Sequence, residues 1–295
     1  MNYHHLRYFH AVAHDGNLTR TADRLNLSQS ALSIQIKQLE ERLGHTLFER
    51  RGRQLLLTEA GRIALDHADR IFSAGDELME TLKRAGMTRR QIRIGALSTL
   101  SRNFQMEFLR PIIGRADIEV ILRSGRTADL LAELESLNLD IVLLNQSPPA
   151  DAATPLVSHL VGTQGVSLVA QPEVAHAKEP LAVRLSKYPL ILPTAESGVR
   201  QQFDALAARL HVKPQIVAEV EDMAMMRLLA REGIGLAVLP PIVVKGELEL
   251  GTLTELATLP NVRESFYAVT IARRFPNPMV SVLIEGSVPE RLHPE

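Results

Sequence analysis

The chain has 295 residues, an apolar fraction of 45% and a net charge of −1, which is enough sequence for two or three domains with separate cores. It contains no cysteine, which excludes disulfide bonds and thiolate chemistry. The sequence begins without a cationic and apolar leader and has no apolar run of about eighteen residues, so we expect a cytoplasmic protein that does not span a membrane.

The charge is distributed unevenly along the chain. Residues 1–57 contain eight lysines and arginines and five acidic residues, a net of +3, so the remainder carries −4. A basic N-terminal segment on an acidic body has the sign expected for contact with a nucleic acid.

Three helices are predicted in the first 45 residues. Residues 3–14 place Leu6, Phe9 and Ala13 on one face of the first helix, and residues 17–25 form the second. After a tight connection, Ser28 is a good N-cap for a third helix over residues 29–43. This third helix has an apolar stripe made of Leu32, Ile36, Leu39 and Leu43, and its other side carries Ser30, Ser33, Ile34 and Lys37. Such a pair of helices is typical of a helix-turn-helix.

Residues 44–58 predict a basic hairpin, or wing. Leu47 and Phe48 can be buried against the helices, and arginines surround Gly52 at the tip. Arginines on a wing suit phosphates or a narrow minor groove. We therefore predict DNA contacts from the third helix and the wing, made by Ser28, Gln29, Ser30, Ser33, Ile34, Lys37, Arg50, Arg51 and Arg53.

The N-terminal motifs resemble those of the LysR-type transcriptional regulators. The resemblance is carried by Leu6, Phe9, Thr21-Ala22, Leu25, Ser28 to Ser33, Ile36, Leu39-Glu40, Leu43-Gly44, Leu47-Phe48, Arg50, Arg53, Leu57-Thr58 and Gly61. It implies a winged helix-turn-helix, a homodimer that often pairs into a homotetramer, and a two-lobed effector domain. Many members carry an arginine where Ile34 stands, so their operator sequences do not transfer to this chain. Later spacings faintly resemble the NhaR-like subgroup.

A long helix is predicted over residues 59–85, with Thr58 as its N-cap. Its apolar stripe comprises Ile63, Ala68, Ile71, Phe72, Gly75, Leu78, Met79 and Leu82. A lone helix of about 40 Å cannot bury such a stripe by itself. An intramolecular core is one partner for it, but a position between two domains favours an antiparallel pair of helices from two subunits, which would read a symmetric operator.

From residue 92 onward, apolar strands alternate with helices, after a hinge at 86–91. Strands are predicted at 92–97, 118–122, 140–144, 168–170, 190–192, 216–220 and 235–239, and helices at 102–114, 126–137, 199–210, 222–232 and 279–285. This alternation indicates parallel sheets covered on both faces. The fold class is therefore α + α/β, a winged helix-turn-helix with a linker helix and a two-lobed α/β domain, which resembles the periplasmic-binding-protein fold.

The predicted domains are 1–58 for DNA binding, 59–87 for the linker and dimerisation helix, and 88–295 for effector binding. Within the last, lobe 1 takes about 91–162 and 268–288, and lobe 2 takes about 163–267, with crossings at 162–165 and 260–268.

Hydroxylic residues follow several of the predicted strands. Ligands of open parallel sheets collect at the carboxyl ends of the strands, and a helix N-terminus flanked by hydroxyls suits a carboxylate or another small anion. Arg102 and Arg200 could add positive charge. Helix capping explains such residues equally simply. The resemblance to the family implies an inducer pocket here, formed by Ser98, Thr99, Ser101, Ser124, Asn145, Thr194 and Ser197.

The predicted function is that of a sequence-specific transcriptional regulator controlled by a small-molecule inducer, an anion or carboxylate rather than a cation. A cluster of Glu219, Glu221 and Asp222 offers a cation site as the alternative. RNA polymerase would be a further partner. An enzyme with a nucleic-acid-binding appendage and a constitutive architectural DNA binder are the competing functions, and the sequence shows no nucleophile elbow or phosphate loop for the former.

We expect neither a cofactor nor a metal site. The adjacent His4 and His5 point about 100° apart on a helix and make a poor chelate, and the sequence contains no set of histidines and carboxylates at metal-binding spacing.

Overall fold

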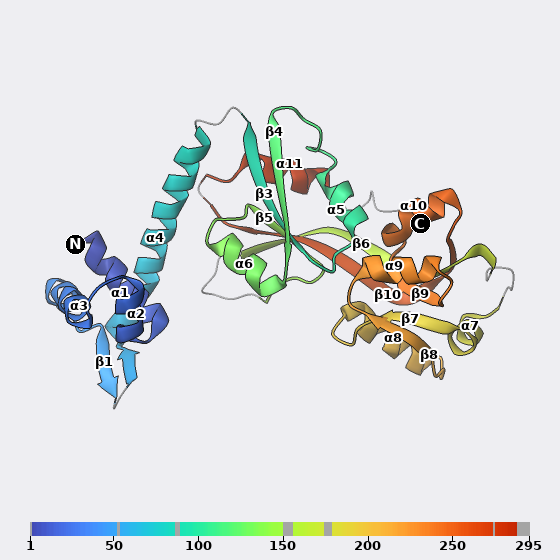
Figure 1. Ribbon diagram of the computed structural model, residues 1–295, viewed down its shortest axis with the longest axis horizontal. Coiled ribbons are helices and arrows are strands. Elements are labelled where there is room, and N and C mark those ends of the chain that lie inside the picture. Colours follow the sequence, from blue (N-terminus) through green and yellow to red (C-terminus); the bar gives the residue numbers. More distant parts are fainter. Residues whose placement is uncertain are drawn as a thin grey trace. The chain divides into compact units, whose positions relative to one another are not determined.

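The computed structural model describes residues 2–51, 54–85, 89–149, 156–173, 179–273 and 275–287. The chain divides into two compact units, Met1–Lys83 and Arg84–Glu295 (Figure 1). In the described part, no helix combines the length and the apolar character that crossing a membrane requires. Each unit is described separately below.

The first unit consists of four helices and a two-stranded hairpin. Its elements are α1 (Tyr3–Asp15), α2 (Leu18–Arg24), α3 (Gln29–Leu43), β1 (Phe48–Arg51), β2 (Gln54–Leu57) and α4 (Glu59–Ala85). Side-chain oxygens of Asn2, Asn17 and Ser28 each accept a backbone N–H in the first turn of the helix that follows, which satisfies a donor that the helix itself leaves free. The predicted limits of α3 and α4 are confirmed.

The core of the first unit joins α1, α3 and α4. Leu6, Phe9, Leu39, Leu47 and Ala68 are buried together, and a second cluster buries Val12, Ala22, Leu32 and Ile36 beneath α2 and α3. The predicted apolar stripe of α3 is therefore right for three of its four members. Leu43, the fourth and the last residue of α3, is exposed.

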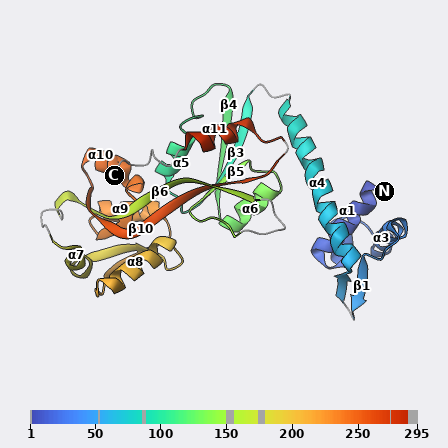
Figure 2. The ribbon, with the colours of Figure 1, turned by 180° about the vertical axis from the view of Figure 1, so that it is seen from behind.

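The second unit contains one continuous sheet of eight strands in the order β4-β3-β5-β10-β6-β9-β7-β8. The strands are β3 (Arg90–Leu97), β4 (Ile118–Gly125), β5 (Ile141–Leu144), β6 (Leu156–Ala170), β7 (Pro189–Pro193), β8 (Gln215–Val220), β9 (Leu236–Leu239) and β10 (Thr254–Ile271). Parallel strands β4, β3 and β5 form lobe 1, and parallel strands β9, β7 and β8 form lobe 2. Strands β6 and β10 pair antiparallel and run through both lobes (Figures 1 and 2).

Helices cover both faces of each lobe. They are α5 (Arg102–Leu109), α6 (Thr127–Glu135), α7 (Leu181–Lys187), α8 (Gly198–Arg209), α9 (Met223–Arg231), α10 (Lys245–Leu250) and α11 (Pro278–Gly286), with a 3-10 turn, η2, at Pro241–Val244. In lobe 1, α6 packs on one face of the sheet and α5 and α11 pack on the other. In lobe 2, α7 and α8 cover one face and α9 the other.

The two stretches predicted as crossings between the lobes, 162–165 and 260–268, lie within strands of 15 and 18 residues. Glycine and polar residues at 162–165 indicate a loop by local propensity, yet their backbone groups pair with β10, so tertiary pairing decides the conformation. The sheet is consequently mixed, whereas the prediction was of parallel sheets. Helix α5 also ends at Leu109 rather than near residue 114.

Candidate functional sites

The outer side of α3 presents an open row of polar side chains. The exposed residues are those predicted there, namely Ser28, Gln29, Ser30, Ser33, Ile34 and Lys37. Ser28 Oγ accepts the backbone N–H of Ala31 at 3.1 Å. The opposite side of the helix is buried at Leu32, Ile36 and Leu39, so packing fixes which side faces outward.

Local hydrogen bonds link α2 to the end of α1 and the start of the hairpin to α3. Asp15 accepts hydrogen bonds from Arg20 Nε at 2.6 Å and from Thr21 Oγ1 at 2.7 Å, and the bond from Arg20 is the main reason that the pKa of Asp15 lies below its ordinary value. Glu40 Oε1, on α3, accepts the backbone N–H of Leu47 at 2.7 Å. The turn between α2 and α3 uses Asn26 with φ of 55°, a left-handed conformation that asparagine tolerates better than most residues.

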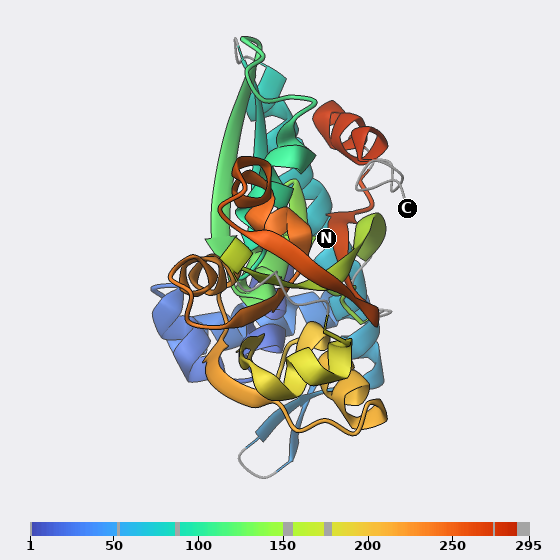
Figure 3. The same cartoon turned by 90° about the vertical axis from the view of Figure 1, so that its right-hand side faces the viewer.

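The wing is a hairpin in which Phe48 pairs with Leu57 and Arg51 pairs with Gln54 (Figure 3, the two blue strands). The backbones of Arg50 and Arg51 therefore lie at the turn end of the wing, where the sequence places them. Arg53 lies outside the described residues, as do the side chains of Arg50 and Arg51.

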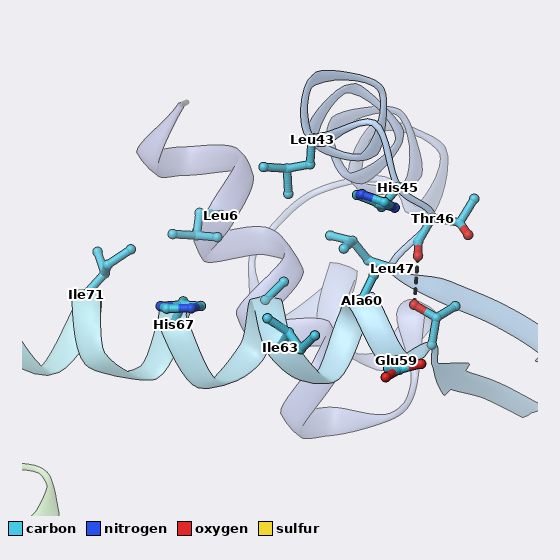
Figure 4. Close-up of a pocket in the computed structure, with 12 residues that line it drawn as sticks. Leu6, Leu43, His45, Thr46, Leu47, Glu59, Ala60, Ile63, His67 and Ile71 are labelled. Carbon is cyan, nitrogen blue, oxygen red and sulfur yellow. Dashed lines mark hydrogen bonds between the residues drawn. The ribbon is translucent and has the colours of Figure 1, made fainter.

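One side of the first unit is apolar and open. Along α4, Ile63, Leu78 and Met79 are each 58% exposed and Leu82 is 61% exposed, although the predicted stripe places them with Ala68, which is fully buried. At the start of α4 lies a hollow of about 860 Å³. Its lining includes Leu6, Leu43, Leu47, Ala60, Ile63, Ala64, His67 and Ile71. Figure 4 shows Leu6 of α1, Leu43 at the end of α3, and Ile63 and Ile71 of α4 around it.

A second hollow, the interlobe cleft, has a volume of about 390 Å³ and is lined from both lobes. Four of the residues predicted from strand ends lie in it, namely Thr99, Asn145, Thr194 and Ser197. They follow β3, β5 and β7, so the carboxyl ends of parallel strands meet here as expected. The other lining residues are not among the predicted pocket residues. They are Leu97, Gln146, Pro193, Glu196, Glu221, Met223 and Met226.

Three predicted residues do not line the interlobe cleft. Ser101 is buried and caps α5, accepting the N–H of Phe104 at 3.4 Å. Ser124 lies within β4 rather than after it, and its Oγ accepts a hydrogen bond from Arg102 Nη1 at 3.0 Å. Ser98 is exposed, and its backbone N–H is bonded to Gly125. The hydroxyls of Ser101 and Ser124 therefore bond within the protein, at a helix cap and to Arg102.

The charges of the cleft differ from those expected. Arg200 donates to Asp204 at 3.0 Å and lies 3.2 Å from Glu219, so its charge is already balanced. Asp222 caps α9 by accepting the N–H of Ala224. Among the three acids suggested as a cation site, only Glu221 lines the cleft. It does so together with Glu196, which makes the described lining acidic.

A buried carboxyl group contacts Asn145, one of the residues that line the cleft. Glu264, in β10, is 3% exposed and accepts a hydrogen bond of 3.4 Å from Asn145 Nδ2, while its Oε2 has no partner among the described residues. Burial raises the pKa of Glu264 to about 7. No sequence pattern points to the burial of Glu264, because an acid inside a strand usually faces solvent.

Two family models match this chain. The LysR substrate binding domain matches residues 85–287, and the bacterial regulatory helix-turn-helix protein, lysR family, matches residues 3–62. The resemblance inferred from the N-terminal motifs is thereby confirmed.

Individual proteins agree with the family models. The RuBisCO operon transcriptional regulator of Allochromatium vinosum is 30% identical over 258 residues, which cover 85% of this chain and 83% of that protein. The transcriptional activator protein NhaR of Escherichia coli (strain K12) is 24% identical over 283 residues, or 95% of this chain and 93% of that one. A full-length structure of LysG from Corynebacterium glutamicum with bound effector Arg has a TM-score of 0.60 at 18% identity, covering 97% of this chain and 98% of that chain. A match across residues 85–287 and 30% identity over most of the chain place this protein in the LysR family of transcriptional regulators.

Proposed function

We propose that this chain regulates transcription by binding a specific DNA site as an oligomer and by responding to a small molecule in the interlobe cleft. The observation that carries the proposal is the open polar side of α3, a capped helix whose other side is buried. A helix presented in this way fits the major groove of B-DNA.

The residues on α3 can make different kinds of contact with DNA. Lys37 and the hydroxyls of Ser30 and Ser33 can bond base edges or phosphates, while Ile34 can pack on a thymine methyl but cannot bond a guanine edge. Arg50, Arg51 and Arg53 on the wing add phosphate or minor-groove contacts. The operator therefore differs from that of relatives with an arginine in place of Ile34.

A second copy of the chain covers the open apolar side of the first unit in this proposal. The exposed leucines of α4 and the hollow beside Leu43 and Ile63 (Figure 4) give an apolar surface that a second α4 can fill. Such a pair would be two-fold symmetric and would suit a palindromic operator. Dimers pair into tetramers in our proposal.

The effector occupies the interlobe cleft. Thr99, Thr194 and Ser197 supply hydroxyls, and the N-terminus of α8 lies at Gly198, which suits a carboxylate or another anionic group. Glu196 and Glu221 in the same lining favour a cationic or hydrogen-donating group at the other end of the ligand. A ligand that prefers one lobe arrangement would shift the protein toward it and so couple the cleft to DNA binding.

The proposed role is regulatory rather than catalytic, and it is performed in the cytoplasm with RNA polymerase as a further partner. The described cleft lining offers hydroxyls and carboxylates but neither histidine nor lysine, and histidine is the base that most often activates a hydroxyl nucleophile. A two-lobed domain with a ligand-sized cleft also favours a regulator over an architectural DNA binder.

The DNA-binding part of the proposal is tested with Lys37→Ala. Titration of the DNA upstream of the gene should show affinity weakened by about tenfold, the loss typical of one good contact, and wild-type affinity should fall with salt. Lys213→Ala, an exposed lysine of the second unit, is the matched control and should bind as wild type does. Equal affinities for Lys37→Ala and wild type would contradict the assignment of α3.

The effector part is tested by thermal shift against a library of small metabolites, since a ligand of the native state raises the melting temperature. Thr99→Val removes one hydroxyl from the cleft and should reduce the shift caused by the best ligand, with DNA affinity in the absence of ligand unchanged. Ser98→Ala, one residue earlier and outside the cleft, is the control. The pocket is misplaced if Thr99→Val responds as wild type does.

A further inference from the structure

A pair of histidines on α1 faces a carboxylate on α4. His10 and His14 are four residues apart, which places their side chains on the same face of the helix. His10 Nε2 lies 2.7 Å from Asp69 Oδ1, and His14 Nε2 lies 2.9 Å from the same oxygen. One nitrogen from each ring and one carboxylate oxygen all lie within 4.8 Å of one another. No sequence motif reveals these three residues as a set, because Asp69 is 55 residues beyond His14 in the chain.

We propose that His10, His14 and Asp69 form a binding site for a divalent transition metal ion of the zinc class. Two imidazole nitrogens and one carboxylate oxygen are the donors that Zn²⁺ and its neighbours Co²⁺, Ni²⁺ and Cu²⁺ accept. Three protein ligands leave a fourth, solvent-filled position on the ion. A tetrahedral ion with bonds of about 2.0 to 2.1 Å separates its donors by about 3.3 Å. Each nitrogen would therefore move about half an ångström away from Asp69 Oδ1, and the two nitrogens would come to lie about 3.3 Å from each other.

The surroundings suit a metal ion. The side chains of His10, His14 and Asp69 are 27%, 54% and 47% exposed, so an ion and its water can reach them. Within the described part of the chain, no lysine or arginine forms an ion pair with Asp69. The ring of His10 also packs on Phe72 at 4.8 Å between centroids, which restricts its orientation.

The site lies on a different side of α4 from the surface assigned to the second subunit. At 100° per residue, Asp69 is about 120° around the helix from Ile63 and about 180° from Leu78. A dimer formed through the apolar side would therefore leave the three ligands open. Since α1 and α4 already share the core of the first unit, a bound ion would add a second link between the same two helices and stabilise that unit.

The test uses the full chain without an affinity tag, titrated with Co²⁺ and then with Zn²⁺. We expect one Co²⁺ per chain with the visible absorption of a tetrahedral ion, displacement by Zn²⁺, and a higher melting temperature with Zn²⁺ than with a chelator. Asp69→Asn and His14→Gln should each weaken binding at least tenfold and abolish the thermal shift. His4→Gln, an exposed histidine on the same helix, should change neither.

Two results would overturn the assignment. One is wild-type binding that is no tighter than that of His14→Gln, which would leave Asp69 as a hydrogen-bond acceptor for two rings. The other is binding that His4→Gln removes, which would place the ion at the N-terminal histidines. Circular dichroism checks that the variants are folded. If His14→Gln does not fold, the metal affinity of Asp69→Asn alone is compared with that of the wild type.

Discussion

Glu264 shows how a single buried group can make stability depend on pH. In the unfolded chain its carboxyl ionises near the ordinary pKa of 4.5, whereas in the folded protein it keeps its proton up to about pH 7. The folded form holds more protons between these values, so the free energy of unfolding decreases as pH rises through this window. Above about pH 7, Glu264 is ionised in both states, so its contribution to the free energy of unfolding no longer changes with pH.

Glu264→Gln should therefore stabilise the second unit at high pH and have little effect at pH 4.5. A pKa raised from 4.5 to about 7 corresponds to about 3 kcal/mol between the two protonation states, and glutamine can still accept the bond from Asn145. Urea unfolding at pH 5, 6, 7 and 8, followed by circular dichroism, measures the difference. A gap between variant and wild type that is constant across this range would show that Glu264 titrates normally.

Individual residues also show the limit of inference from sequence at the candidate site. Thr99 and Ser101 are two residues apart and chemically alike, yet one lines the cleft and the other caps a helix. Both roles use the same hydroxyl, so residue type cannot separate them. The path of the backbone between β3 and α5 decides which of the two hydroxyls lines the cleft. Glu196, which also lines the cleft, is not singled out by the sequence for a related reason, since exposed acids near strand ends are common.

At the scale of elements, α4 was predictable because its signals are local. Its apolar repeat, its N-cap at Thr58 and its length all follow from neighbouring residues, and the helix spans Glu59–Ala85 as predicted. The full lengths of strands β6 and β10 were not predictable, because their central residues pair with partners about a hundred positions away in the chain. Local propensity carries no information about such pairing.

Gly61 fixes how α4 leaves the wing. A Cβ at this position would lie 2.1 Å from the backbone oxygen of Leu47, so any side chain forces the helix away from the hairpin. Gly61→Ala should lower the stability of the first unit by roughly 1–3 kcal/mol despite the better helix propensity of alanine. Thermal unfolding measures this effect.

Gly75→Ala is the matched control in the same helix. Its Cβ would meet only the end of the Tyr3 side chain, at 3.2 Å, and that hydroxyl can move aside. We expect Gly75→Ala to be neutral or slightly stabilising. If the two variants unfolded alike, the contact between Gly61 and Leu47 would not constrain the unit.

At the scale of the whole molecule, the open apolar side of α4 predicts that oligomer formation depends on a few leucines. Leu78→Glu combined with Leu82→Glu should raise the dissociation constant of the dimer by at least about a hundredfold. Each buried leucine contributes about 1.5–3 kcal/mol and appears twice in a symmetric pair. Light scattering during size-exclusion chromatography gives the mass.

Met106→Glu tests whether any added charge would have the same effect. Met106 is exposed on α5, in the second unit, and its substitution should leave the mass unchanged. A wild-type protein that elutes as a monomer, or a double variant that remains dimeric, would rule out the proposed role of α4.

The placement of β10 between β5 and β6 has a consequence for the order of folding during synthesis. Lobe 1 begins with an early part of the second unit, but its sheet lacks a central strand until β10, which starts at Thr254, has been made. A nascent chain can therefore fold the first unit, whose contacts are all made by residue 83, long before lobe 1 can close. Lobe 2 lies between the two halves of lobe 1, so chains that stop before β10 would carry a finished N-terminal unit and an open, aggregation-prone sheet.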